Sequence, residues 1–208
     1  GSYTTADTTT NSGTSGSGGS DTINAYTISN TGSGVEYRAY NTTGAVNNSN
    51  TLSSGTSPQD AVTLGDSIYA AATDGSGNPA VFQLNKDTGD VTNSYTVHSG
   101  TIQAIDTDGS SVYTGASDST VKKTNPDTGN VEWSYTMGGA VTDLEVGPDG
   151  NIYAADNSGN VEKLSPDGTS TQTILANGPV TALTVGENGN VYVADTESMF
   201  GGTTVTIS

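Results

Sequence analysis

The residues of this 208-residue chain that could carry out chemistry are few and widely spaced. The single histidine, His98, precedes Ser99-Gly100, and cysteine is absent, so no second imidazole or thiol is available to complete a metal site or a catalytic pair. The sequence contains no Gly-x-Ser-x-Gly elbow, phosphate-binding loop or zinc-ligand spacing. We therefore expect His98 to be a structural loop residue and the protein to be non-enzymatic.

A second candidate is the segment Asp106-Thr107-Asp108-Gly109, which resembles the beginning of a calcium loop because calcium prefers clustered carboxylates. The later ligands and the bidentate glutamate of an EF-hand are missing from it. A turn between two strands accounts for the same residues. The sequence accordingly predicts no bound metal and no cofactor.

Two Asn-x-Ser/Thr sequons begin at Asn41 and Asn47. Such sequons are acceptors for N-linked glycans in exported proteins. Because the chain is rich in Asn and Thr, sequons also arise in it by chance. Asn41 and Asn47 are therefore candidate glycosylation sites that depend on export.

A tyrosine recurs along the chain at Tyr26, Tyr69, Tyr113, Tyr153 and Tyr192, at intervals of 43, 44, 40 and 39 residues. The last four follow an Ile or Val and precede small or β-branched residues, which is the pattern of one apolar strand repeated four times. A repeat of about 40 residues built from short strands and turns is typical of a β-propeller blade. We expect Tyr69, Tyr113, Tyr153 and Tyr192 to occupy equivalent positions in successive blades.

The clearest repeat unit is Val141–Pro179, which predicts an all-β blade of four strands. Its first strand, 141–146, alternates apolar and polar residues, and Pro-Asp-Gly segments supply two of its turns. The remaining strands of this unit are predicted at 151–156, 161–164 and 171–175. Similar units are predicted at 22–55, 58–100, 101–140 and 180–208.

Residues 1–20 are rich in Ser, Thr and Gly and predict a linker or tether, whereas residues 21–208 carry the propeller repeat. Alternatively, Tyr3–Thr10 forms a strand that closes the ring. The first unit lacks an evident first strand, and the last ends in a strand at Thr204–Ile207 without an evident fourth. This pattern favours about five blades with a shared seam; the alternatives are four blades, or a fragment of a larger ring.

The charge balance is strongly acidic, with 22 carboxylates, five Lys or Arg and a net charge of -17. Such a surface repels itself in dilute salt, whereas at about 1 M salt the Debye length falls to about 3 Å. Abundant Asp, scarce Lys and few large apolar residues resemble proteins of salt-loving archaea and their viruses; an acidic extracellular protein of ordinary salt is the alternative. Without a basic stripe, nucleic-acid binding is not expected, and no apolar run is long enough to span a membrane.

The segment 125–136 contains an Asp-Thr-Gly turn followed by a strand with Trp133, and 85–91 repeats the turn, with Tyr95 near the equivalent aromatic position. A weaker copy lies at 41–46. These repeats resemble those of quinoprotein-like (PQQ-type repeat) β-propellers, which implies that Trp133 packs between blades. WD-type repeats match less well, because no Trp-Asp pair ends a strand. The dehydrogenases of that family have more blades, a calcium site and often a cysteine pair, so the resemblance implies its non-catalytic branch.

Together these features predict a surface recognition or adhesion module, most specifically a spike or fibre component of a virus of halophilic archaea, at the virion surface. Its expected partners are a host surface glycan or S-layer protein, other virion or envelope proteins reached through the N-terminal tether, and further copies in a homo-oligomer. One alternative is an extracellular or cell-envelope scaffold of a halophilic archaeon. Another is a hydrolase or lyase whose acids converge in the propeller funnel.

Overall fold

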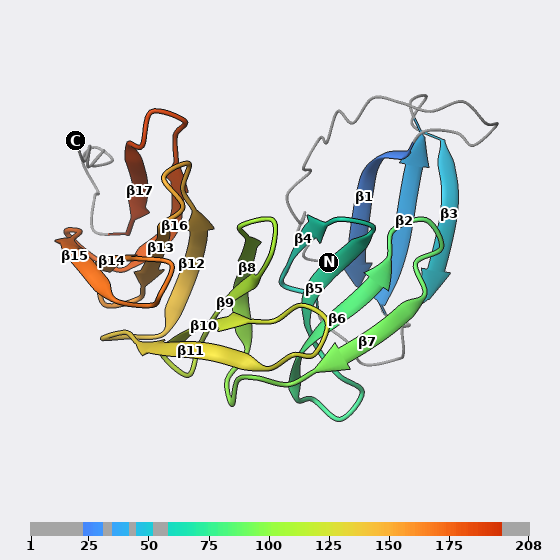
Figure 1. The fold of residues 1–208 in the computed structure, drawn as a ribbon, viewed down its shortest axis with the longest axis horizontal. Helices are drawn as coiled ribbons and strands as arrows, with labels where there is room; N and C mark the ends of the chain where they lie inside the picture. The colour runs from blue at the N-terminus through green and yellow to red at the C-terminus, as the bar shows by residue number, and fades with distance from the viewer. Residues whose placement is uncertain (1–22, 31–34, 42–44, 52–57, 197–208) are drawn as a thin grey trace. The chain divides into compact units, whose positions relative to one another are not determined.

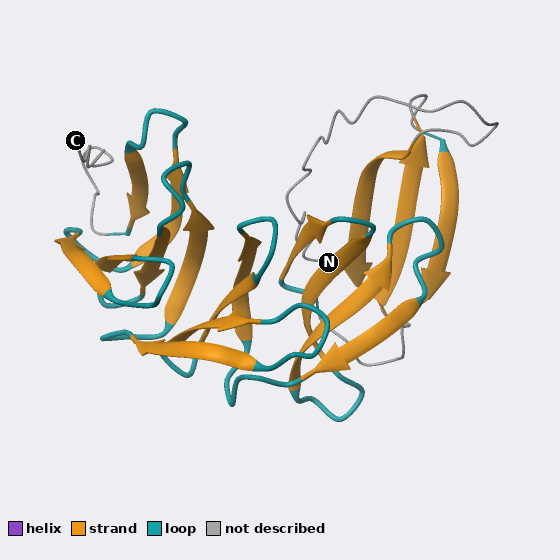
Figure 2. Ribbon diagram, in the orientation of Figure 1, coloured by secondary structure: helices purple, strands orange, loops and turns teal. Residues whose placement is uncertain are grey.

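The computed structural model describes residues 23–30, 35–41, 45–51 and 58–196. Within these ranges the chain is all-β, with seventeen strands in five antiparallel sheets and no helix (Figure 1, Figure 2). Three sheets contain four strands each, in sequential order, which is the construction of a β-propeller blade. The chain therefore folds as a β-propeller.

We number the sheets as blades 1 to 5 in chain order. Blade 1 contains β1 (Ile23–Asn30), β2 (Val35–Asn41) and β3 (Val46–Thr51). Blade 2 contains β4 (Asp60–Leu64), β5 (Ser67–Thr73), β6 (Pro79–Asn85) and β7 (Val91–Tyr95). Blade 3 contains β8 (Ile102–Thr107), β9 (Val112–Ala116), β10 (Thr120–Thr124) and β11 (Val131–Thr136). Blade 4 contains β12 (Val141–Val146), β13 (Ile152–Asp156), β14 (Asn160–Leu164) and β15 (Ser170–Leu175), and blade 5 contains β16 (Val180–Val185) and β17 (Val191–Asp195).

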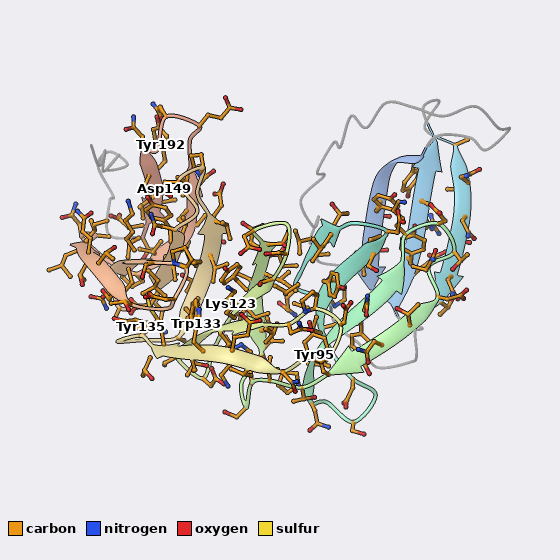
Figure 3. The ribbon with its side chains drawn as sticks, viewed as in Figure 1. Tyr95, Lys123, Trp133, Tyr135, Asp149 and Tyr192 are labelled. Atoms are coloured by element: carbon orange, nitrogen blue, oxygen red, sulfur yellow. The ribbon has the colours of Figure 1, made fainter. Side chains whose placement is uncertain are left out.

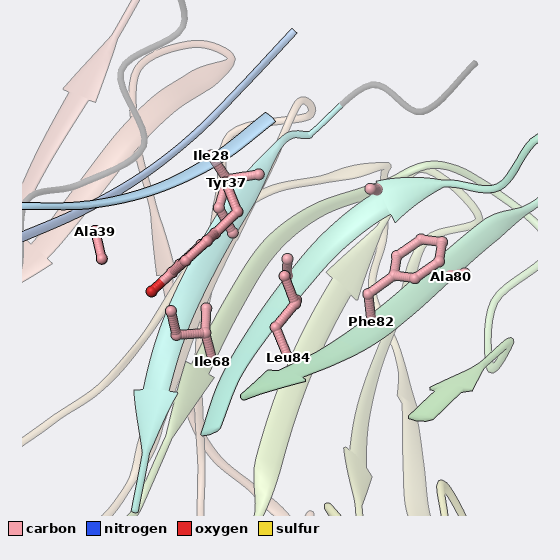
Figure 4. Packing of buried hydrophobic residues seen from close by; sticks show 9 residues of the cluster. Ile28, Tyr37, Ala39, Ile68, Ala80, Phe82 and Leu84 are labelled. Carbon is pink, nitrogen blue, oxygen red and sulfur yellow. The ribbon is translucent and has the colours of Figure 1, made fainter. Parts of the chain in front are cut away.

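The blades form two compact units, which are described separately: blades 1 and 2 belong to a unit that ends at Tyr95, and blades 3 to 5 to one that begins at Thr96. In each unit, apolar side chains from the facing surfaces of successive blades make the core. In the first unit, Ile28 and Tyr37 of blade 1 pack in one cluster with Ile68, Phe82 and Leu84 of blade 2 (Figure 4). Each blade therefore buries its apolar face only by packing against its neighbour.

In the second unit, two such clusters follow each other. The first joins blades 3 and 4 and includes Tyr113, Val141 and Ile152. The second joins blades 4 and 5 and includes Tyr153 and Val180. Ala, Val and Tyr are prominent in these layers, so each pair of neighbouring blades has its own core cluster despite the low content of large aliphatic residues.

Four of the repeated tyrosines lie in the strands that follow the first turn of blades 2 to 5, and Tyr26 lies in β1, the first described strand of blade 1. Tyr69, Tyr113 and Tyr153 are at most 2% exposed, whereas Tyr192 in β17 is 39% exposed. Their register partners on the preceding strands are Val62, Asp106, Glu145 and Thr184, respectively. Among the described residues, β17 pairs with β16 alone.

Several sequence predictions lie outside the described residues. These are the tether at 1–20, the alternative strand at Tyr3–Thr10 and the third strand of the last unit at Thr204–Ile207. The closing of the ring depends on these segments, so the choice among five blades, four blades and a fragment stays a prediction.

Candidate functional site

His98 lies just before β8 and is buried, with 4% of its surface exposed. Its Nδ1 atom lies 3.2 Å from both carboxylate oxygens of Asp118 and 3.0 Å from Thr120 Oγ1, and its Nε2 atom lies 2.8 Å from Thr114 Oγ1. Asp118, in the turn between β9 and β10, also accepts a hydrogen bond of 2.9 Å from Ser99 N. These contacts fasten the segment that enters β8 to the middle of the same blade.

The electrostatics of this cluster favour a structural role. Burial lowers the pKa of His98, against the opposing effect of the Asp118 carboxylate, so the imidazole is neutral at pH 7. Burial alone would raise the pKa of Asp118, but hydrogen bonds from Thr120 and Ser99, together with His98, lower it to about 2. Because both ring nitrogens of His98 are engaged, neither has a free lone pair with which to take a proton from a substrate.

The segment that resembles a calcium loop spans the end of β8 and the start of the turn between β8 and β9. Asp108 Oδ1 accepts hydrogen bonds from Ser110 N (2.8 Å) and Ser111 N (2.7 Å), and its Oδ2 accepts one from Tyr113 Oη (2.8 Å). The neighbouring Asp106 carboxylate bonds instead to the next blade. The described residues contain no group of three or more His, Asp or Glu side chains placed to hold a metal ion.

Three carboxylates on the first strands of blades 3 and 4 bond to backbone amides on the first strand of the following blade. Donor and acceptor are 40 residues apart in every pair, which matches the length of the repeat. The first strand is an edge strand, whose outer N–H groups have no partner within their own sheet. The pairs are Val146 N to Asp106 Oδ2 (2.7 Å), Leu183 N to Asp143 Oδ2 (2.6 Å) and Val185 N to Glu145 Oε2 (2.9 Å).

We call Asp106, Asp143 and Glu145 the first-strand carboxylates. Burial raises the pKa of Asp106 and of Asp143, and repulsion from neighbouring carboxylates adds to the shift in both. A buried carboxyl group with a raised pKa has the proton affinity of a general acid. Both oxygens of these two aspartates are already engaged, however, since the second oxygen accepts the amide of the next residue at 2.8 Å in Asp106 and 2.9 Å in Asp143. The arrangement is suited to linking blades.

All five cations of the chain are held by groups of their own unit. Two of them also lie over tyrosine rings: Lys123 Nζ is 5.8 Å from the Tyr113 centroid, and Lys163 Nζ is 5.3 Å from the Tyr153 centroid. Because the cations are used internally, the carboxylates in excess have no counter-charge. The pairs are Arg38–Glu36 (2.8 Å), Lys86–Asp66, Lys123–Glu132 (3.3 Å), Lys163–Asp149 (2.8 Å) and Lys122 Nζ with the Val97 carbonyl.

Trp133 lies in β11 at the contact between blades 3 and 4, beside its register partner Lys123 (Figure 3). Its Nε1 atom donates a 3.0 Å hydrogen bond to the Pro166 carbonyl in the turn after β14. Gly168 in the same turn has φ +85°, and a Cβ atom there would lie 2.6 Å from the indole ring. The glycine therefore allows both the turn and the close approach of the tryptophan.

Tyr95 is not the structural equivalent of Trp133. It faces Val81 across the β6–β7 ladder, as Tyr135 faces Val121 in blade 3. The residue in register with Trp133 is Asn93. Because alternate residues of a strand share one face, Tyr95 and Asn93 point the same way, so Tyr95 lies near the position equivalent to Trp133, two residues further along the strand.

Of the two sequons, only the one at Asn47 has described side chains. Asn47 and Ser49 lie on β3 and are exposed. Asn41 ends β2, and its side chain lies outside the described residues. Asn41 and Asn47 belong to the first unit, whereas His98 and the first-strand carboxylates belong to the second.

The comparisons with known proteins bear on the fold alone. No family model matches the chain, and no curated protein does. Among solved structures, the chain is similar to the WD40 β-propeller domain of Doa1, with a TM-score of 0.67 and 17% sequence identity. The alignment covers 81% of this chain and 56% of that one, so this chain spans little more than half the length of that structure. In the described residues, no helix is long and apolar enough to cross a membrane.

Sequence reasoning missed the first-strand carboxylates. A signal was present, because Asp106 and Glu145 stand at corresponding positions of two successive repeats. That signal is hard to recognise, since Val62 and Thr184 occupy the same register position in β4 and β16. Strand alternation places such residues on a face, but it does not reveal an amide of the next blade as their partner.

Proposed function

We propose that this propeller is a non-enzymatic recognition or adhesion module that works on a surface bathed in concentrated salt. The proposal rests on one observation, which is that the polar side chains make their contacts within the fold. The imidazole of His98 and the carboxylates of Asp106, Asp108 and Asp143 are saturated by contacts within their own blade or with the next one. In a domain whose polar side chains are engaged in contacts that hold the fold together, the outer surface is what can bind a partner.

The acidic surface supports the salt-loving setting. With a net charge of -17 and all five cations engaged internally, the exposed carboxylates repel one another in dilute salt. Concentrated salt screens this repulsion. The most specific form of the proposal is a spike or fibre component of a virus of halophilic archaea, which binds a host surface glycan or S-layer protein. A cell-envelope scaffold of a halophilic archaeon shares the same physical properties.

Binding tests the proposal directly. The purified chain, labelled at its N-terminus, is incubated in about 3 M KCl with intact halophilic archaeal cells, isolated S-layer protein and arrayed envelope glycans. We expect saturable binding to one of these, with competition by unlabelled protein. Absence of binding to all of them, at a salt concentration where circular dichroism shows the folded state, would contradict the recognition role. Capsid or tail genes beside the coding gene would favour the virus over the cellular scaffold.

The rival enzymatic function has one specific observation in its favour, namely the raised pKa of Asp106 and Asp143. A hydrolase or lyase that used Asp143 as its acid would lose its rate when Asp143 is replaced by asparagine, while the fold persists. A screen of glycoside and ester substrates with the wild-type chain and the Asp143→Asn variant distinguishes the two functions. A rate that Asp143→Asn or His98→Ala abolishes in a folded protein would overturn the non-enzymatic proposal.

A further inference from the structure

The last strands of blades 1 to 4 share an irregularity near their beginning. In each, the pairing with the preceding strand skips one residue, which forms a β-bulge. The skipped residue occupies the second position of the strand in all four blades, and its side chain is exposed in each. The four bulge residues are Asn47, Thr92, Glu132 and Thr171.

Three of these bulge residues bond back to the neighbouring strand of their own blade. Thr92 Oγ1 donates to the Gln83 carbonyl at 3.2 Å, and Thr171 Oγ1 donates to the Lys163 carbonyl at 3.0 Å. The Glu132 carboxylate lies 3.3 Å from Lys123 Nζ, again on the neighbouring strand. In these three blades the bulge side chain helps to hold the last strand in place.

Asn47 departs from this pattern. Among the described residues, its side-chain amide makes no hydrogen bond and no ion pair, and it is exposed to solvent. The next residues alternate in a regular way: Asn48 turns toward blade 2, where its Nδ2 atom donates to the Asp87 carbonyl at 2.7 Å, and Ser49 is exposed again. Asn47 and Ser49 thus present the two functional groups of the sequon on the solvent side of an edge strand.

We propose that Asn47 carries an N-linked glycan. Its free amide is the acceptor, Ser49 supplies the hydroxyl that the sequon requires, and the bulge holds the acceptor out of the β2–β3 ladder. The inference rests on the proposed surface location, because N-linked glycans are added to exported proteins. Asn48, which lies between them, begins no sequon, because the residue two positions later is Asn50, and its amide bonds to blade 2.

A glycan at this position would also protect β3. This strand lies at the outer edge of blade 1, and Val46, the residue before Asn47, is 49% exposed. An exposed edge strand can pair with a second chain, and proteins block this with charges, bulges or covering groups. The bulge and a bulky, hydrated sugar attached to it would act together against such pairing.

The test is to secrete the chain, with a host signal peptide, from a halophilic archaeon that N-glycosylates its own S-layer protein, and to measure intact masses. Four versions are compared: wild type, Asn47→Gln, Ser49→Ala and Ser49→Thr, each also in an Asn41→Gln background that removes the other sequon. In that background we expect wild type and Ser49→Thr to carry one glycan mass, and Asn47→Gln and Ser49→Ala to carry none. The host S-layer protein from the same culture shows that the glycosylation system is active.

The inference is overturned if the secreted Asn41→Gln protein has its unmodified mass while the S-layer protein is glycosylated, or if its added mass survives Asn47→Gln. Neither result bears on the proposed recognition function, which the cell-binding assay tests separately. Conversely, a glycosylated protein that binds no host surface would refute the recognition function and leave the assignment of Asn47 standing.

Discussion

Replacing Asp143 tests whether a carboxylate on a first strand holds two blades together. Its Oδ2 atom accepts the Leu183 amide of blade 5 at 2.6 Å, and its Oδ1 atom accepts the Leu144 amide at 2.9 Å. Alanine removes both acceptors and leaves the Leu183 amide, on a buried residue, without this partner. A hydrogen bond to a charged group contributes about 1.5–3 kcal/mol, so we expect a loss of about 2 kcal/mol.

In a chain of this size, a loss of about 2 kcal/mol lowers the melting temperature by about 4–8 °C. Asparagine is the informative second variant, because it keeps a carbonyl acceptor and removes the charge. The raised pKa of Asp143 indicates that its buried charge is unfavourable at pH 7. We therefore expect Asp143→Asn to melt within about 2 °C of wild type or above it.

The pH dependence has a definite sign. Because the folded-state pKa of Asp143 is raised above the unfolded value, its penalty is fully present above the folded-state pKa and fades as the pH falls toward the unfolded value. The wild type should therefore gain stability relative to Asp143→Asn as the pH is lowered from 7 toward 4. Thermal melts followed by circular dichroism in about 3 M KCl measure both effects. Glu187→Gln, which removes one exposed charge in the turn after β16, is the matched control.

Two results would refute this reasoning. If Asp143→Ala has the same melting temperature as the wild type, the hydrogen bond to blade 5 contributes nothing measurable to stability. If Asp143→Asn falls as far as Asp143→Ala, the charge, and not the acceptor, is what stabilises the contact. In the first case the spacing of 40 residues between donor and acceptor would be a by-product of the repeat.

Three further predictions concern the other parts of the scaffold. Gly168→Ala should destabilise the fold by at least about 1 kcal/mol in a urea melt, because φ +85° strains an L-residue and the new Cβ meets the Trp133 ring; unchanged stability would contradict the packing seen here. His98→Ala should lower stability and leave cell binding intact. The stability that neutral His98 contributes should decrease as the pH falls from its unfolded pKa of about 6.5 toward its lower folded-state pKa. A difference in stability between variant and wild type that does not change with pH would contradict this. The melting temperature should climb from 0.1 M to several molar KCl, and sulfate at matched ionic strength should raise it further; a flat chloride curve would remove the main support for a halophilic origin.

The fold class could be predicted from the sequence because several different features of the sequence show the same repeat. Tyr69, Tyr113 and Tyr153 recur at nearly constant spacing within one apolar strand motif, and turns with glycine separate the strands. Alternation, turn chemistry and spacing agree, and such agreement makes a prediction reliable. Strand boundaries followed within about one residue: the fourth strand of Val141–Pro179, for example, was predicted from Thr171 and begins at Ser170.

The contacts between blades could not be read in this way. Spacing shows that Asp106 and Glu145 correspond, but whether a carboxylate meets an amide, a cation or solvent depends on how one blade packs against the next. The exact position of Tyr95 could not be predicted for a similar reason, because Asn93 and Tyr95 lie on the same face of β7 and only the register shows which of them corresponds to Trp133. Local pattern determines the face of a strand, and tertiary packing determines the partner.

The same distinction indicates where function can be sought in a repeat protein. A residue that recurs with its contacts, such as Thr92 and Thr171 on their carbonyls, is explained by the scaffold that every blade shares. A residue that occupies the same structural position without those contacts does not help to hold the strands of its blade together. Asn47 is such a residue, because its bulge has the geometry of the others and its amide, within the described residues, has none of their bonds. The positions to test first are therefore those that depart from the repeat in their contacts as well as in their residue type.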